Sequence, residues 1–161
     1  MGISVLKLCQ IIPDGILLFV PSYHLMDKLI KRWQSTDLWK RLAQVKGALV
    51  SEPKEAGSAF DASMRSFKMG VEAGRGALLI AVCKGKASEG IDFSDKYARG
   101  VLIVGIPFAA AKDTKVNLKK EFNNNPIYRH PGQKLVTGDV WYRQQAFRAL
   151  NQALGRCIRH R

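Results

Sequence analysis

The stretch GALLIAV, residues 76–82, contains no polar side chain and predicts a strand buried on both faces of a sheet. GILLFV, residues 15–20, has the same character and ends at Pro21. Two further segments, 48–51 and 100–107, also fit short apolar strands. Strands without polar alternation are typical of a parallel sheet that helices cover on both faces.

Helical patterns separate these strands. Ser22 is predicted to cap a helix whose apolar residues follow the 3.6-residue period. Ser58 and Asp61 fit a capping box that opens a second helix. A basic helix is expected over 112–122, and Asp139 is expected to cap the closing helix. This alternation of strands and helices predicts an α/β fold.

The composition is that of a folded protein with a large excess of positive charge. The 161 residues fit a single domain, and 26 Lys and Arg against 13 Asp and Glu give a net charge of +13. Such an excess predicts a polyanionic partner, with nucleic acid first and an anionic membrane surface second. No apolar run approaches the ~20 residues that span a bilayer, and no export or anchor signal is expected.

The cysteines do not predict a metal site. Cys9, Cys83 and Cys157 are far apart in the chain and form no C-x-x-C pair. They are expected to be inert thiols in a reducing compartment.

The closing stretch, NQALGRCIRHR, carries the sharpest functional signal. On a helix Gln152, Arg156 and Arg159 share one stripe, because they are spaced i, i+4 and i+7. Two guanidinium groups and an amide can bind a polyphosphate through several hydrogen-bond donors, although a solvent-exposed helix face gives the same spacing. Gly155 costs roughly 1 kcal/mol against Ala inside a helix, which indicates close approach of another group.

A polar, Gly-rich loop over 84–95 follows the most apolar strand. Ligands bind at this edge of open α/β sheets. Glu89 and Asp92 fit residues that fix the loop or accept hydrogen bonds from Arg or ribose, with a general acid/base pair as the alternative. The phosphate-binding motif G-x-x-x-x-G-K-[ST] fails, because Ala87 follows Lys86. The chain is therefore not expected to hold a nucleotide by itself.

Three segments, near 17–23, 84–95 and 148–161, together resemble motifs IV, V and VI of the iron–sulfur DNA helicases of superfamily 2, the XPD/DinG-like group. Residues 105–108 resemble the strand end that follows motif V. The resemblance spans roughly residues 12 to 161 and is tightest to the Fanconi anaemia group J helicases, with the RTEL telomere helicases next.

The resemblance implies that residues 1–161 form the second of two RecA-like motor domains, with ATP and Mg²⁺ bound between them. The first motor domain, with its Walker A motif, DEAH box and 4Fe-4S cluster, is not in this sequence, and the last strand expected after Arg161 is also missing. The implied activity is 5′–3′ ATP-dependent DNA unwinding in repair or genome maintenance, in the nucleus. The implied partners are single-stranded or forked DNA and the first motor domain, with no membrane.

The resemblance also assigns roles to single residues. The motif VI positions that reach the γ-phosphate, and so act in catalysis, are Gln152, Arg156 and Arg159. The motif V positions that couple nucleotide state to the DNA strand are Glu89, Gly90 and Asp92. The positions expected to meet the phosphates of single-stranded DNA are Ser22, Lys84, Lys86 and Ser88.

Two other functions fit the sequence less well. A nucleic-acid-binding or regulatory remnant domain without an ATPase role explains the charge but leaves the stripe of Gln152, Arg156 and Arg159 unexplained. A small Rossmann-like metabolic enzyme lacks the required cofactor fingerprint.

Overall fold

A computed structural model describes residues 1–55, 57–91, 93–128 and 136–155. Four parallel strands form one sheet in the order β2-β3-β1-β4. Their bounds are β1 (Gly15–Val20), β2 (Ala48–Ser51), β3 (Ala77–Val82) and β4 (Gly100–Ile103). The two central strands, β1 and β3, are buried along their whole length. The predicted parallel α/β sheet is confirmed.

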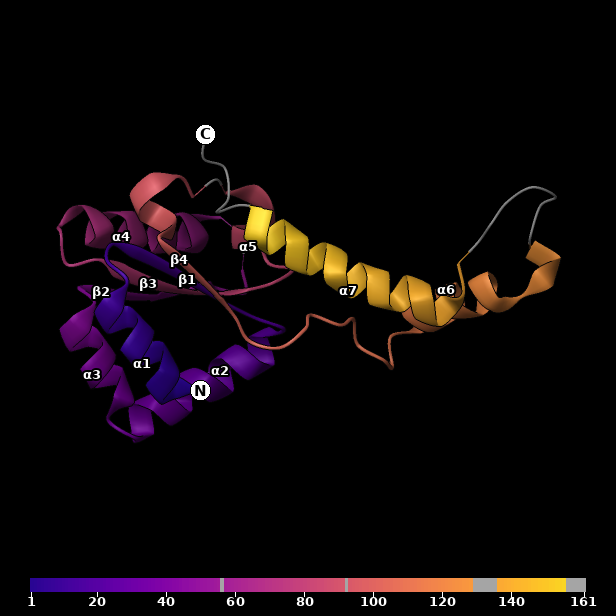
Figure 1. Ribbon diagram of the computed structural model, residues 1–161, viewed down its shortest axis with the longest axis horizontal. Helices are drawn as coiled ribbons and strands as arrows, with labels where there is room; N and C mark the ends of the chain where they lie inside the picture. Colours follow the sequence, from indigo (N-terminus) through magenta and orange to yellow (C-terminus); the bar gives the residue numbers. More distant parts are fainter. Residues whose placement is uncertain (56, 92, 129–135, 156–161) are drawn as a thin grey trace.

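Helices cover both faces of the sheet (Figure 1). One face packs against α1 (Gly2–Ile11), α2 (Tyr23–Ser35) and α3 (Leu38–Val45). The other face packs against α4 (Ser58–Glu72), the 3-10 helix η1 (Asp95–Ala98) and the short α5 (Lys86–Gly90). Neighbouring strand residues point to opposite faces, so that Leu18 joins the first core and Phe19 the second.

Two helices, α1 and α3, are not predicted from the sequence. Neither helix has a side-chain cap: α1 follows Met1, and Asp37 at the N-cap of α3 makes no capping hydrogen bond through its side chain. They are held by packing instead, because Val5 and Leu6 of α1 and Leu42 of α3 are buried in the same core.

Two predicted helix caps need correction. The helix α4 begins at Ser58 itself, and Gly57 with φ 91° stands at the cap position, so the predicted capping box is wrong. The helix α7 (Gly138–Gly155) begins one residue before Asp139, and the Oγ1 of Thr137 accepts from the N–H of Val140 at 3.4 Å. Asp139 instead pairs with Lys120, at 2.9 Å between Oδ1 and Nζ.

Two predicted boundaries also shift. The strand expected over 100–107 pairs only over Gly100–Ile103, and Gly105 then turns the chain with φ 75°. The basic helix is α6 (Thr114–Asn124), and the carboxylate of Asp113 caps its first turn.

The last helices form an arm that extends from the sheet (Figure 1). The helix α6 leads into the 3-10 turn η2 (Pro126–Tyr128), and α6 packs along α7. Gly138 is needed at the contact, because a Cβ there would overlap the backbone of Lys120. At the other end of α7, Ala153 is buried in the core of the sheet. None of the described helices is long and apolar enough to cross a membrane.

Candidate functional site

The two central strands end side by side at the carboxyl edge of the sheet. Val20 at the end of β1 is in register with Val82 at the end of β3. The N–H of Cys83 continues the ladder by donating to the Val20 carbonyl at 2.9 Å. The turn at Pro21 and Ser22 therefore lies beside the loop that follows β3, which brings the predicted motifs IV and V together. Open α/β sheets bind their ligands at this edge.

Ser22 is the N-cap of α2, as the sequence predicts. Its Oγ accepts a hydrogen bond from the N–H of Leu25 at 3.2 Å, and its side chain is exposed. A hydroxyl that accepts one hydrogen bond can still donate its own proton. Ser22 can thus hold the helix start and donate to an anion at the same time.

The segment after β3 forms a tight turn and a short helix rather than an extended loop. The N–H of Gly85 donates to the Val82 carbonyl at 2.8 Å, and α5 follows directly. Lys84 is exposed. Lys86 is half-buried, with its Nζ 5.9 Å from the centre of the Phe60 ring. The turn thus places one lysine on each side of Gly85 at the carboxyl edge of the sheet.

Ser88 does not lie on the surface, where a residue that contacts single-stranded DNA should lie. Its side chain is fully buried, and its Oγ is 2.8 Å from the carbonyl oxygens of both Cys83 and Gly85, to either of which it can donate. Its backbone N–H donates to the Gly85 carbonyl at 3.2 Å. The expected contact of Ser88 with a DNA phosphate is therefore wrong, because its hydroxyl is buried and both its hydroxyl and its N–H donate to carbonyls of the turn.

Glu52 belongs to the site and was missed in the sequence. Only 1% of the residue is exposed, although it carries a carboxylate. Its Oε2 accepts from the N–H of Val82 at 2.8 Å, and its Oε1 accepts from the N–H of Ala87 at 3.0 Å. The sequence signal for it is an acid directly after a short apolar strand.

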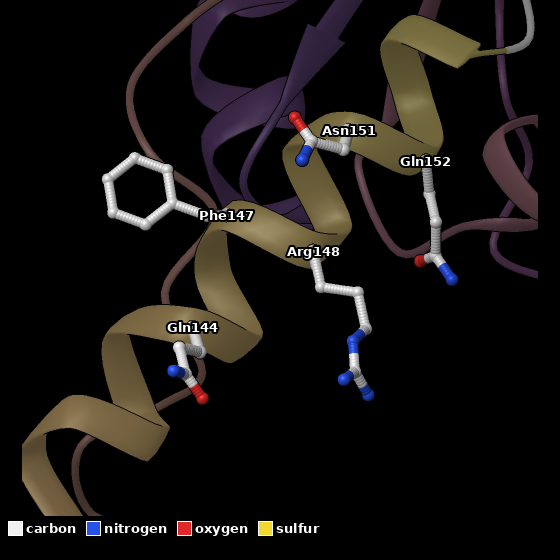
Figure 2. A pocket seen from close by; sticks show the side chains of 5 residues that line it. All are labelled: Gln144, Phe147, Arg148, Asn151 and Gln152. Carbon is white, nitrogen blue, oxygen red and sulfur yellow. The ribbon is translucent and has the colours of Figure 1, made fainter. Parts of the chain in front are cut away.

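The motif VI helix presents a polar side near its end. Gln152 is exposed and lines a shallow hollow of about 450 Å³ together with Gln144, Phe147, Arg148 and Asn151. Figure 2 shows the side chains of Arg148 and Gln152, one turn apart, pointing to the same side of the helix, with Phe147 directed away from them.

The end of α7 rests on the motif V segment. Ala87 of α5 and Ala153 of α7 are both fully buried in one cluster with Phe93. Small side chains let the two helices approach closely, and α5 and α7 are in contact. Gln152 therefore lies next to the residue that packs on motif V.

Several predicted site residues are not placed. Arg156, Arg159 and Asp92 lie outside the described residues. Glu89 and Gly90 are the last two residues of α5, and the Glu89 side chain is not described. The roles of these five residues stay predictions.

The described cysteines are buried thiols. Burial raises the pKa of Cys9 to about 11, with a small opposing effect of the Lys46 charge, and burial also raises the pKa of Cys83 to about 11. Within the described ranges no three His, Cys, Asp or Glu side chains come together as a metal site. Cys157 lies outside those ranges.

Comparison with known proteins decides the family. The family model described as the helicase C-terminal domain matches residues 5–161. The chain belongs to this family. It is 47% identical over 163 residues to the Fanconi anemia group J protein homolog of Gallus gallus, covering 99% of this chain and 13% of that protein. It is 40% identical over 173 residues to the regulator of telomere elongation helicase 1 homolog of Arabidopsis thaliana, covering 100% of this chain and 16% of that protein.

A third relative agrees with these two. The regulator of telomere elongation helicase 1 homolog of Drosophila melanogaster is 40% identical over 161 residues, covering 100% of this helicase C-terminal domain and 16% of the relative. The resemblance to the group J and RTEL helicases is confirmed. The chain spans between 13% and 16% of the length of these relatives.

Proposed function

We propose that this helicase C-terminal domain is the second motor domain of an ATP-dependent DNA helicase that acts in DNA repair or genome maintenance in the nucleus. One observation carries the proposal. The turns of motifs IV and V adjoin at the carboxyl edge of the sheet, and the motif VI helix packs against motif V through Ala87 and Ala153. A domain arranged in this way can hold a DNA strand and a nucleotide on connected elements.

Single-stranded or forked DNA is the proposed partner at the carboxyl edge. Ser22 offers a hydroxyl, and Lys84 and Lys86 offer charge. Contacts of this kind go to phosphates and position a strand without reading its sequence. The net charge of +13 attracts the strand from a distance.

The proposed nucleotide is ATP with Mg²⁺, bound mainly by the first motor domain. This chain has no phosphate-binding loop, so its contribution is one wall of the site. The exposed amide of Gln152 fits such a wall. We assign Arg156 and Arg159 to the γ-phosphate, where Arg side chains stabilise the charge that develops during phosphoryl transfer.

The motif V residues Glu89, Gly90 and Asp92 are proposed to couple the nucleotide to the strand. The family further implies 5′–3′ movement and a 4Fe-4S cluster on the first motor domain, and both remain part of the proposal. Closing and opening of the cleft between the two domains would then move the protein along the DNA.

The test joins this domain to a first motor domain of the same family in one polypeptide. Arg156→Ala and Arg159→Ala should each lower the kcat for ATP hydrolysis by ~10² or more, because the lost charge acts mainly in the transition state. The affinity for single-stranded DNA should change little. The matched control is Arg143→Ala, an exposed Arg on α7, which should leave kcat unchanged.

The same variants separate the alternative function. A nucleic-acid-binding domain without an ATPase role is favoured by the net charge alone. It predicts the reverse pattern for Arg156→Ala and Arg159→Ala, with weaker DNA binding and an unchanged kcat at saturating DNA. That result would refute the proposed catalytic role.

A further inference from the structure

A buried carboxylate sits at the centre of the carboxyl edge. Glu52 follows β2, and its N–H donates to the Ile80 carbonyl at 2.8 Å, which extends the sheet by one residue. The side chain then crosses over the end of β3, where its two oxygens accept from the N–H groups of Val82 and Ala87. A carboxylate with 1% exposure needs such donors, because an unpaired buried charge is strongly unfavourable.

The motif V turn is wrapped closely around this carboxylate. A Cβ added at Gly85 would overlap both carboxylate oxygens of Glu52. Gly85 has an extended backbone, so the glycine is needed for the close approach and not for an unusual backbone angle. Lys84 and Lys86 are its immediate neighbours, and their positions therefore depend on where the carboxylate holds the turn.

The same carboxylate reaches the motif IV turn. Tyr23 follows Ser22 at the start of α2, and burial raises the pKa of Tyr23 while the charge of Glu52 and a hydrogen bond to its carboxylate raise it further. Glu52 thus connects three segments that are distant in sequence: the end of β2, the motif IV turn and the motif V turn.

Contact continues from the carboxylate toward motif VI. The N–H that Glu52 holds belongs to Ala87, which is itself packed in one buried cluster with Ala153 of α7. A displacement of the turn would therefore reach the helix that carries Gln152.

We propose that Glu52 is a positioning residue that holds the motif IV and motif V turns in the arrangement that binds a DNA strand. The inference rests on the proposed DNA contact of Lys84, Lys86 and Ser22. Glu52 itself is buried and touches neither DNA nor nucleotide.

The test uses Glu52→Gln in the 161-residue chain, with Glu55→Gln as the matched control. Glu55 is exposed, so both substitutions raise the net charge by one from +13, but only one changes the buried acceptor. A Gln side chain at position 52 has only one acceptor oxygen, so its NH₂ group, which is a donor, would face one of the two backbone N–H donors. Hydrogen exchange at the N–H groups of Val82 and Ala87 reports on the turn directly.

Exchange at one or both of these N–H groups should become about 5-fold to 100-fold faster in Glu52→Gln, since a buried donor loses its acceptor. Affinity for a labelled oligothymidylate should fall about 3-fold or more in the same variant, although the loss of one negative charge alone would strengthen binding. Glu55→Gln should leave exchange unchanged and bind equally or more tightly. Exchange and affinity that match the unaltered chain would overturn the inference.

A second variant covers the case in which Glu52→Gln does not fold. Gly85→Ala adds a methyl group that would overlap the Glu52 carboxylate, and it leaves the net charge unchanged. It should also speed hydrogen exchange at the Ala87 N–H and weaken DNA binding. Unchanged exchange and affinity in a folded Gly85→Ala chain would equally overturn the inference. If the unaltered chain binds no oligothymidylate, the proposed DNA contact fails, whereas exchange in the variants still decides whether Glu52 holds the turn.

Discussion

The two lysines of the motif V turn give the most direct test of DNA binding. We expect Lys84→Gln combined with Lys86→Gln to weaken the binding of single-stranded DNA by the 161-residue chain. Lys84 is exposed and Lys86 is half-buried, and neither makes a described ion pair. Surface substitutions of this kind usually change the free energy of unfolding by no more than about 0.5 kcal/mol, so the fold should persist.

The salt dependence of binding sets the expected magnitude. Each phosphate that a protein neutralises on a single strand contributes about 0.7 to the slope of log affinity against log salt concentration. Loss of Lys84 and Lys86 should lower the slope by about 1.4, so the affinity advantage of the unaltered chain should shrink about sevenfold between roughly 50 and 200 mM salt. Lys86 should contribute less free energy, because leaving the Phe60 ring costs about 0.5–1 kcal/mol.

Fluorescence anisotropy with a labelled oligothymidylate at several salt concentrations measures both quantities. The control is Lys7→Gln combined with Arg41→Gln, which removes the same charge from exposed positions on α1 and α3. This control should leave the slope nearly unchanged if binding is confined to the carboxyl edge. An equal loss of slope in both double variants would show that DNA binds anywhere on the basic surface, and the assignment to the motif V turn would be refuted.

Three further outcomes follow from the sequence and the packing. The isolated chain should hydrolyse no ATP with or without single-stranded DNA, because it has no phosphate-binding loop, and a single-turnover assay would expose any activity. Phe67→Ala should lower the free energy of unfolding by about 3–5 kcal/mol in urea titrations, because Phe67 is fully buried, whereas Phe147→Ala at a half-exposed ring should cost much less. Since burial raises the pKa of Cys9 and Cys83 from 9.0 to about 11, the folded chain keeps protons that the unfolded chain loses in this range. Stability should therefore fall as the pH rises from 9.0 to about 11, and urea titrations at both ends of that window would show a constant midpoint if this is wrong.

Local sequence rules worked where one segment alone decides the structure. The apolar runs of β1 and β3 identify strands that are buried on both faces, and Ser22 caps α2 through a bond to a residue three positions later. The rule failed at Ser58, because Gly57 can adopt a positive φ and takes the cap position instead. Both choices satisfy local chemistry, so the sequence could not separate them.

The site was only partly predictable for the same reason. Lys84 and Lys86 follow a buried strand, and this position is visible in the sequence. The inward direction of Ser88 is not visible, since it depends on how the turn closes. Glu52 was missed because its acceptors serve backbone donors 30 and 35 residues away.

The sequence by itself determined the strands, the class of fold, the charge and the three motifs, because periodicity and composition record which side chains are buried and which chemistry they carry. Only the tertiary structure decided the strand order β2-β3-β1-β4 and the closure of the motif V turn around the Glu52 carboxylate. Strand order and long-range hydrogen bonds depend on how distant segments pack together. That packing is a property of the whole chain, and no local pattern encodes it.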